Sequence, residues 1–295
     1  MISQSEVLKD LEGLDLEGSD LFPAVVKRSY ERARITQRKF SLAISRSGAL
    51  LPESSCVCIN GSVSRLESVQ DSDIDFVLIW NDALAGNNDK SRSIEAIEKI
   101  NRSMIGVDLR PCNSFSCQQP ISDILCTENL FSRYSILTLV DSSFVAGDPV
   151  AYTDTLDEIR RKLDEYAIGL SADMQVIRAL MWYIQREGWI DQLHFGTSVN
   201  RFSRLIQLFT TILSVHQFGI DETRSTKPTW MRIGRLEPHL NNDVTECLKR
   251  LWIKALEFKE TRAERPMLRD NNFIGVSKLV EIWQDILKIS QVPVG

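Results

Sequence analysis

The stretch of sequence that decides the fold is residues 57–80, Val-Cys-Ile-Asn-Gly-Ser-Val-Ser-Arg-Leu-Glu-Ser-Val-Gln-Asp-Ser-Asp-Ile-Asp-Phe-Val-Leu-Ile-Trp. The apolar runs at residues 57–59 and 76–80 predict two short buried strands. Asn60-Gly61-Ser62 ends the first of them. Glycine allows a tight turn there because it has no Cβ, and the backbone N–H groups of Gly61 and Ser62 are then free to meet a phosphate.

Two carboxylates stand at the start of the second predicted strand. Asp73 and Asp75 are separated by one residue, and side chains alternate faces along a strand, so both carboxylates are expected on one side of the sheet. Like charges on one face repel, which disfavours this arrangement in a strand that serves stability alone. A divalent cation removes the objection, because oxygen ligands are those that Mg²⁺ takes. The pattern therefore predicts a metal site beside the Gly-Ser turn.

This constellation resembles the nucleotidyltransferase superfamily typified by DNA polymerase beta and the PII uridylyltransferases. The superfamily pattern is an apolar strand, Gly-Ser, a helical spacer and Asp-x-Asp on the next strand, and it is matched here by Gly61, Ser62, Asp73 and Asp75. Within it, Arg65-x-Glu67 and Ser-Asp-Ile-Asp at residues 72–75 are closest in wording to the uridylyltransferases and to the nucleotidyltransferases associated with CBS domains.

A second segment extends the resemblance. Residues 123–148 are similar to the uridylyltransferase segment in which a helix ends in Leu-Leu-Asp-x-Arg-x-x-x-Gly-Asp. Leu139, Asp141 and residues 146–148 keep that wording, whereas Ser143 stands where the family has arginine. Taken as a pattern, residues 144–145 predict a brief strand that ends at Gly-Asp-Pro.

The resemblance implies a fold class and a set of ligands. It implies an α/β (α+β) nucleotidyltransferase domain with a small mixed sheet, followed by an all-helical domain. It also implies Mg²⁺, with Mn²⁺ as the alternative ion, held by Asp73, Asp75 and Asp108. Asp108 lies in the apolar segment 104–110, where the superfamily carries a third acidic residue on a neighbouring strand. The alternative for Asp108 is an aspartate on an edge strand.

Basic residues near these motifs have two interpretations each. Arg65 is either a phosphate ligand in the nucleotide site, because a guanidinium binds phosphate with two donors, or a structural partner of Glu67 or Asp71. Lys227, Arg232 and Arg235 reach the triphosphate or, by default, belong to a solvated surface. The basic residues between positions 27 and 34 are interpreted as a solvated helix face.

Length and composition bound the rest. The chain has 295 residues, a hydrophobic fraction of 43% and a net charge of −5. This composition is typical of a globular protein, and this length indicates two domains or one large domain. The net charge is negative and so does not indicate nucleic acid as a partner. A local basic patch is left as the alternative. Six cysteines without paired spacing and three histidines argue against structural zinc, and Cys56 and Cys58 are expected to be buried free thiols. No apolar stretch reaches the length of a membrane span and no signal-like segment opens the chain, so we expect a cytoplasmic protein without membrane contact.

Hydrophobic periodicity divides the chain into three parts. Residues 1–20 are an acidic N-terminal arm, residues 21–150 the catalytic domain, and residues 151–295 a helical substrate-binding domain. In the first domain helices are expected at 21–48 and 91–103. In the second they are expected at 155–172, 173–187, 200–218, 244–263 and 276–289, with a loop at 223–230.

The function that these observations predict is transfer of a nucleoside monophosphate from a nucleoside triphosphate, ATP or UTP among them, with release of pyrophosphate. The acceptor is an unidentified protein or small molecule, in the manner of a uridylyltransferase or an adenylyltransferase. Two alternatives remain: an enzyme of the same fold that polymerises nucleotides or makes an oligonucleotide, and an inactive regulator that binds nucleotide.

Overall fold

The computed structural model describes residues 22–46, 51, 54–69, 72, 74–80, 92–100, 117–120, 130–166, 169–190, 193, 199–261 and 275–289. The chain forms two compact units. The sheet unit comprises Met1–Asn129 and Asp141–Ile159, and the helical unit comprises Leu130–Val140 and Arg160–Gly295.

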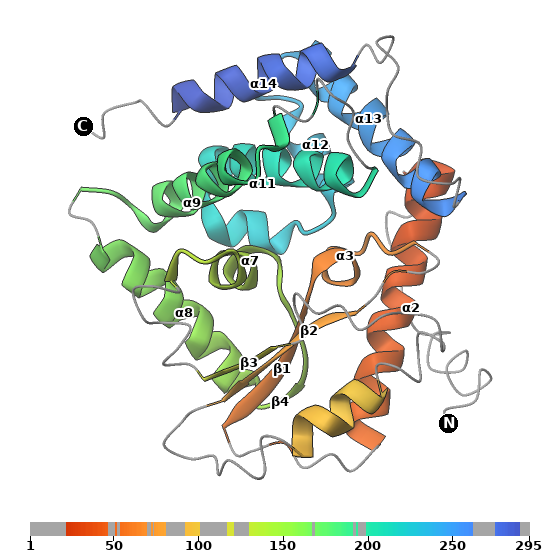
Figure 1. Cartoon of the computed structure of the whole chain (residues 1–295), viewed down its shortest axis with the longest axis vertical. Helices are drawn as coiled ribbons and strands as arrows, with labels where there is room; N and C mark the ends of the chain where they lie inside the picture. The colour runs from red at the N-terminus through yellow and green to blue at the C-terminus, as the bar shows by residue number, and fades with distance from the viewer. Residues whose placement is uncertain are drawn as a thin grey trace. The chain divides into compact units, whose positions relative to one another are not determined.

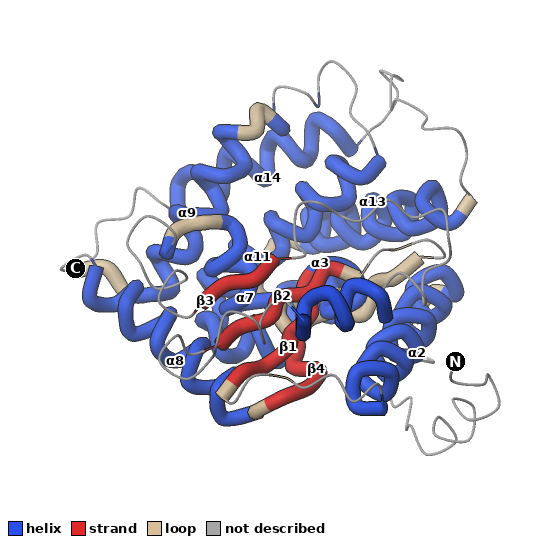
Figure 2. The backbone as a smooth tube through the Cα atoms, turned by 60° about the horizontal axis from the view of Figure 1, so that its bottom comes forward, coloured by secondary structure: helices blue, strands red, loops and turns tan. Residues whose placement is uncertain are grey.

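A small mixed sheet is the centre of the first unit (Figure 2). Its strands are β1 (Ser55–Asn60), β2 (Asp75–Trp80), β3 (Cys117–Pro120) and β4 (Ser143–Gly147), in the order β3-β2-β1-β4. β1 is antiparallel to both β2 and β4, and β3 is parallel to β2. The register of β1 and β2 places Cys58 opposite Val77 and Asn60 opposite Asp75. The last residue of β1 therefore lies beside the first residue of β2.

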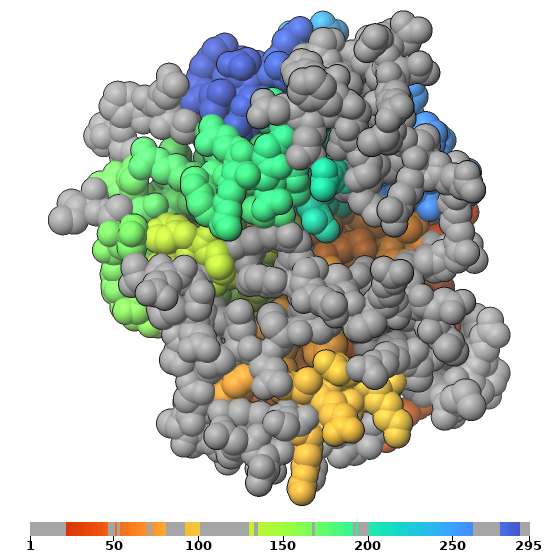
Figure 3. All heavy atoms as spheres, viewed as in Figure 1, coloured from red at the N-terminus to blue at the C-terminus, as the bar shows by residue number. Residues whose placement is uncertain are grey.

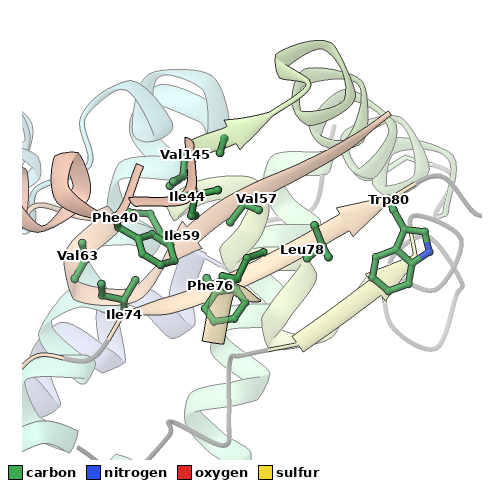
Figure 4. Packing of buried hydrophobic residues seen from close by; sticks show 12 residues of the cluster. Phe40, Ile44, Val57, Ile59, Val63, Ile74, Phe76, Leu78, Trp80 and Val145 are labelled. Carbon is green, nitrogen blue, oxygen red and sulfur yellow. The ribbon is translucent and has the colours of Figure 1, made fainter. Parts of the chain in front are cut away.

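One face of this sheet carries the main core of the unit. Figure 4 shows Val57 and Ile59 of β1 together with Phe76, Leu78 and Trp80 of β2 on this face. Helix α2 (Ala24–Arg46) contributes Phe40 and Ile44 to the same cluster, and the rings of Phe40 and Phe76 lie 6.1 Å apart. Burying such apolar side chains contributes about 1.5–3 kcal/mol each to folding. The sheet and α2 are held together chiefly by this contact.

The opposite face of β1 and β2 is also buried. Cys56 and Cys58 project there because strand side chains alternate, and both are free and fully buried, as predicted. Val77 and Ile79 of β2 share that face and are equally buried. By the same alternation Asp75 belongs to this face, opposite the one that α2 covers.

Two further helices of the sheet unit matter for the site. α3 (Gly61–Ser64) is a single turn that follows β1 directly. The helix at residues 92–100 lies at the surface of the unit, shown in yellow in Figure 3, and buries Ile97 in the core cluster. Gln37 of α2 donates a hydrogen bond from Nε2 to the Val63 carbonyl oxygen at 2.9 Å, which fixes α3 against α2.

The second unit is helical in all its described elements (Figure 1). Those elements are α7 (Arg133–Asp141), α8 (Pro149–Tyr166), α9 (Ala172–Arg186), α11 (Val199–Ser225), α12 (Thr229–Leu236), α13 (Asn242–Glu260) and α14 (Gly275–Ile289), with α8 beginning and α7 ending in the sheet unit. Phe209 of α11 stacks on Trp283 of α14 with ring centroids 5.8 Å apart. Helix α11 is broken at Gly219, whose φ is 78°, and Asp173 of α9 accepts a hydrogen bond from the next backbone N–H at 3.0 Å. Among the described residues no helix has both the length and the apolar character that a membrane crossing needs.

The predicted fold class is confirmed, since a small mixed sheet with helices is followed by a helical unit. Some elements differ from expectation, among them α8, which spans Pro149–Tyr166 where a helix was expected at 155–172. β3 was not predicted, and most of residues 223–230, expected as a loop, belong to the end of α11 and the start of α12. The division at residues 150 and 151 was expected from sequence, whereas the compact units change at 129/130, 140/141 and 159/160.

Candidate functional site

The Gly-Ser turn is built by an abrupt change from strand to helix. β1 ends at Asn60, and α3 begins at the next residue. Gly61 has a φ of +72°, in the left-handed region that side chains disfavour. Asn60 is buried, whereas Gly61 and Ser62 are partly exposed, so the turn is anchored on one side and accessible on the other. The predicted turn at these residues is therefore present.

Asp75 lies directly against this turn. A Cβ built on Gly61 would stand 2.3 Å from Oδ2 of Asp75, closer than any real contact between these atoms. Glycine at position 61 is thus favoured for two reasons: side chains disfavour its φ, and an added methyl group would force the Asp75 carboxylate to move. Asp75 is partly exposed, although its Oδ1 atom is buried. The structure accordingly brings together Gly61 and Asp75, which are separated by fourteen positions in the sequence.

The other two predicted metal ligands, Asp73 and Asp108, lie outside the described residues. The described residues contain no group of three or more acidic, histidine or cysteine side chains suited to a metal ion. Asp75 is the one predicted ligand among the described residues, and its chemistry fits the expected cation, because a carboxylate held beside an accessible turn offers the oxygen donors that Mg²⁺ takes.

Arg65 occupies a buried position behind the turn. Its Nε lies 3.0 Å from Oε2 of Glu67, and its Nη1 lies 3.3 Å from Oδ2 of Asp141. The Arg65 residue is 7% exposed, and Glu67 and Asp141 are buried to a similar degree. Burial alone lowers the pKa of the guanidinium, but the charges and hydrogen bonds of Asp141 and Glu67 outweigh burial and raise this pKa. Of the two roles that the sequence left open for Arg65, this geometry favours the structural one, with Glu67 as expected and with Asp141 in addition.

Asp141 is the residue of this region whose role the sequence did not assign. It ends α7 and precedes β4, 76 positions after Arg65. Its backbone carbonyl accepts a hydrogen bond from the Ser64 hydroxyl, while its carboxylate contacts Arg65. The available signal was the aspartate that residues 139–148 share in wording with the uridylyltransferases. That similarity singles out Asp141 but does not indicate that Arg65 is its partner.

The basic residues of the helical unit divide by burial. Arg232 is fully buried and bonds to backbone and hydroxyl oxygen atoms, so its default assignment to a solvated surface was wrong. Arg235 is partly exposed and lies 2.9 Å from the carboxylate of Glu222. Each contact lies within the helical unit.

Comparison with known proteins agrees with this geometry at a general level. A family model described as "Putative nucleotidyltransferase DUF294" matches residues 25–118, about a third of the chain. The matched segment includes β1, α3, β2 and all of α2 except its first residue, and hence both Gly61 and Asp75. No curated protein matches the chain. The match supports a nucleotidyltransferase-like family and a transferase that uses a nucleoside triphosphate, but not the uridylyltransferase branch in particular.

Proposed function

We propose that this protein is a metal-dependent nucleotidyltransferase that transfers a nucleoside monophosphate from a nucleoside triphosphate to a protein or small-molecule acceptor. The observation that carries the proposal is the contact between Gly61 and Asp75. A carboxylate and an accessible Gly-Ser turn then lie together where β1 ends and β2 begins. Both belong to the segment that the nucleotidyltransferase family model matches.

The reaction needs few covalent roles from the protein. An acceptor oxygen or nitrogen atom attacks the α-phosphorus, the bond from that phosphorus to the bridging oxygen of the β-phosphate breaks, and pyrophosphate leaves. Catalysis of this type rests on positioning and on stabilisation of charge at the transferring phosphate. A bound Mg²⁺ supplies that stabilisation and orients the triphosphate.

We assign the roles of the chain as follows. Asp75, with Asp73 and Asp108, holds Mg²⁺. Asp108 also accepts the proton that the acceptor loses. Gly61 and Ser62 contact the triphosphate through backbone N–H groups, and both residues are partly exposed. Arg65 has no direct contact with phosphate in this scheme.

The test is nucleotide transfer by the full-length protein. It is incubated with Mg²⁺ and each α-phosphate-labelled ribonucleoside triphosphate, with a protein extract or a small-molecule extract as the source of acceptor. We expect pyrophosphate release and label on one acceptor class, and a loss of at least about 100-fold in Asp75→Asn, since even outer-shell changes at metal sites cost 10–100-fold. Full activity in folded Asp75→Asn would remove this residue from catalysis. Binding of nucleotide without release of pyrophosphate would identify a regulator. Absence of binding for every nucleotide would overturn the proposal.

A further inference from the structure

The turn that contains Gly61 and Ser62 is closed by a helix-ending motif with an unusual residue in it. The Leu66 N–H donates to the Val63 carbonyl at 3.2 Å, and the Glu67 N–H donates to the Ser62 carbonyl at 2.8 Å. This pair of hydrogen bonds is the Schellman pattern. In it the residue after the helix cap adopts a left-handed conformation and is usually glycine. Here that residue is Leu66, with a φ of 62°. A leucine is strained in this conformation, so neighbouring contacts must hold it in place.

The contacts on both sides of Leu66 form the buried ion cluster of Arg65, Glu67 and Asp141. Arg65 precedes Leu66 and Glu67 follows it, and their side chains meet at 3.0 Å. The second contact of Arg65, to Asp141 at 3.3 Å, ties this pair to the start of the connection to β4. Ser64 adds a hydrogen bond from its hydroxyl to the Asp141 backbone. The cluster thereby fixes the two residues that flank the strained position.

The same backbone segment carries the predicted phosphate contacts. The carbonyl of Gly61 accepts from the Arg65 N–H at 3.2 Å, and the carbonyl of Ser62 accepts from the Glu67 N–H. Both residues of the turn are therefore bonded directly to backbone whose side chains belong to the ion cluster. A displacement of Arg65 or Glu67 would shift the N–H groups that meet the triphosphate, and misplacement of about 1 Å is costly in a catalytic site.

We infer that Asp141, through Arg65 and Glu67, is a positioning residue that holds the Gly61-Ser62 turn in the geometry that binds the triphosphate. The inference rests on the proposed function for its ligand, but its structural half stands on the cluster alone. The cluster is buried and holds two carboxylates on one guanidinium. Neutralising Asp141 leaves Arg65 paired with Glu67 alone and removes the bond that ties the turn to Asp141, and shortening Arg65 weakens both pairs. Stability and turn geometry then change together, and the test must separate them.

The test uses three variants of the full chain. Asp141→Asn keeps the shape and removes the charge, and Arg65→Lys keeps the charge but loses the two-armed guanidinium. Tyr152→Phe is the matched control, because Tyr152 is buried in the same unit and donates to the Ser142 carbonyl at 3.0 Å, one residue after Asp141. All three variants lose a buried polar contact, and those that Tyr152→Phe removes include the ones with the hydroxyl and the carbonyl of Ser142.

The first measurement is hydrogen exchange at the amides of Arg65, Leu66 and Glu67, corrected for global unfolding. We expect exchange to accelerate about 10- to 100-fold in Asp141→Asn and Arg65→Lys, as the loss of charge-assisted hydrogen bonds implies, and to stay unchanged in Tyr152→Phe. Exchange at the same rate in Asp141→Asn and Tyr152→Phe would overturn the positioning role, whether or not that rate exceeds the wild-type rate.

The second measurement is equilibrium binding of Mg²⁺ with ATP or UTP, at a temperature where every variant is folded. We expect the dissociation constant to rise about tenfold in the two cluster variants and not in the control. A wild-type protein that binds neither these nor the other ribonucleotides overturns the proposed function. A wild-type protein that binds, with cluster variants that bind equally well, overturns the positioning role alone.

Discussion

Two residues explain why the candidate site is where it is. Asp75 is the first residue of β2 and pairs with Asn60. Its carboxylate therefore lies against Gly61, the residue after Asn60. Any larger residue there would force the carboxylate to move. The sequence explained glycine at position 61 by the needs of a turn, and the structure adds a second reason that depends on the register of two strands.

These two reasons make Gly61→Ala a sharp test at the residue scale. Gly169 is the control, because its φ of 86° is also left-handed but no described heavy atom lies within 4 Å of the place that an added methyl group would take. Gly169→Ala should cost only backbone strain, about 1 kcal/mol, while Gly61→Ala should cost about 1 kcal/mol more, because the methyl group also forces the Asp75 carboxylate to turn away. Urea denaturation measures both, and transfer activity should be lost in Gly61→Ala only.

A double variant identifies the cause of that difference. Asp75→Ala removes the carboxylate that the added methyl group would meet. Gly61→Ala combined with Asp75→Ala should therefore be less destabilised than the sum of the single changes, by about 1 kcal/mol or more. Strict additivity of the two changes would mean that the close approach of Gly61 and Asp75 does not exist.

The thiol of Cys56 gives the sheet unit a defined response to alkaline pH. Burial, aided by the charge of Asp148, raises the pKa of this thiol from its ordinary value of 9.0 to about 12. Below pH 9 both the folded and the unfolded chain keep the proton, so the contribution to stability is complete. Between pH 9 and 12 only the unfolded chain loses it, so stability falls as pH rises. At pH 10 the loss should be about 1.4 kcal/mol.

The measurement compares the free energy of unfolding at pH 8 and pH 10 in wild type and in Cys56→Ala. Other groups that titrate in this range contribute equally to both proteins and cancel. The decrease between the two pH values should be smaller in Cys56→Ala by about 1.4 kcal/mol. An identical decrease in both proteins would show that Cys56 titrates normally and is accessible to water.

At the scale of elements, the parts that the sequence predicted are those that bury their own apolar pattern. β1, β2 and α2 follow from runs and periodicities that the core then uses directly. β3 (Cys117–Pro120) has no such pattern, since its residues are Cys-Gln-Gln-Pro, and it is a strand because β2 pairs with it. α12 was missed because Lys227 and Pro228 indicate a loop, whereas proline here precedes the first helical residue.

The candidate site shows the same division. Gly61, Ser62 and Asp75 were predictable because a local motif marks them. The pairing of Arg65 with Asp141 was not, since no local rule connects residues 76 positions apart. The left-handed Leu66 was equally hidden, because the residue that normally indicates this conformation is glycine.

Arg232 of α12 makes a prediction about how a helix is held. Its guanidinium donates to the carbonyl oxygens of Thr226 at 2.8 Å, Thr223 at 3.1 Å and Val140 at 3.4 Å, and to the hydroxyl of Thr211 at 2.8 Å. A lysine cannot reach four acceptors in these directions. Arg232→Lys should therefore destabilise the helical unit by about 2–4 kcal/mol.

Arg235→Lys is the control for that change. Arg235 lies on the same helix and pairs with Glu222, but its side chain is 38% exposed, so the loss should be at most about 1 kcal/mol. Chemical denaturation of both variants gives the comparison. Equal losses would show that the buried fork of Arg232 adds nothing beyond its charge.

At the scale of the whole molecule, the division into two units determines how a ligand should affect stability. The residues proposed to bind Mg²⁺ and nucleotide all belong to the sheet unit, which also contains the ion cluster. A ligand that binds only a folded state stabilises it by mass action, by about 2.7 kcal/mol when its concentration is a hundred times its dissociation constant. The stabilisation should therefore belong to one unit rather than to the chain as a whole.

Thermal melting tests this expectation in the full-length protein. Arg232→Lys, which weakens the helical unit, identifies the part of the melting curve that this unit produces. Mg²⁺ with the bound nucleotide should raise the transition of the sheet unit by about 5–10 °C, as expected for a unit of this size. The transition that Arg232→Lys lowers should not move with ligand. Asp75→Asn should melt no lower than wild type without ligand, because it removes one of the three negative charges proposed to hold Mg²⁺, yet it should lose the ligand shift. A ligand shift of equal size in Asp75→Asn would show that the nucleotide binds elsewhere. A shift confined to the transition that Arg232→Lys lowers would place the binding site in the helical unit and refute the site at Gly61 and Asp75.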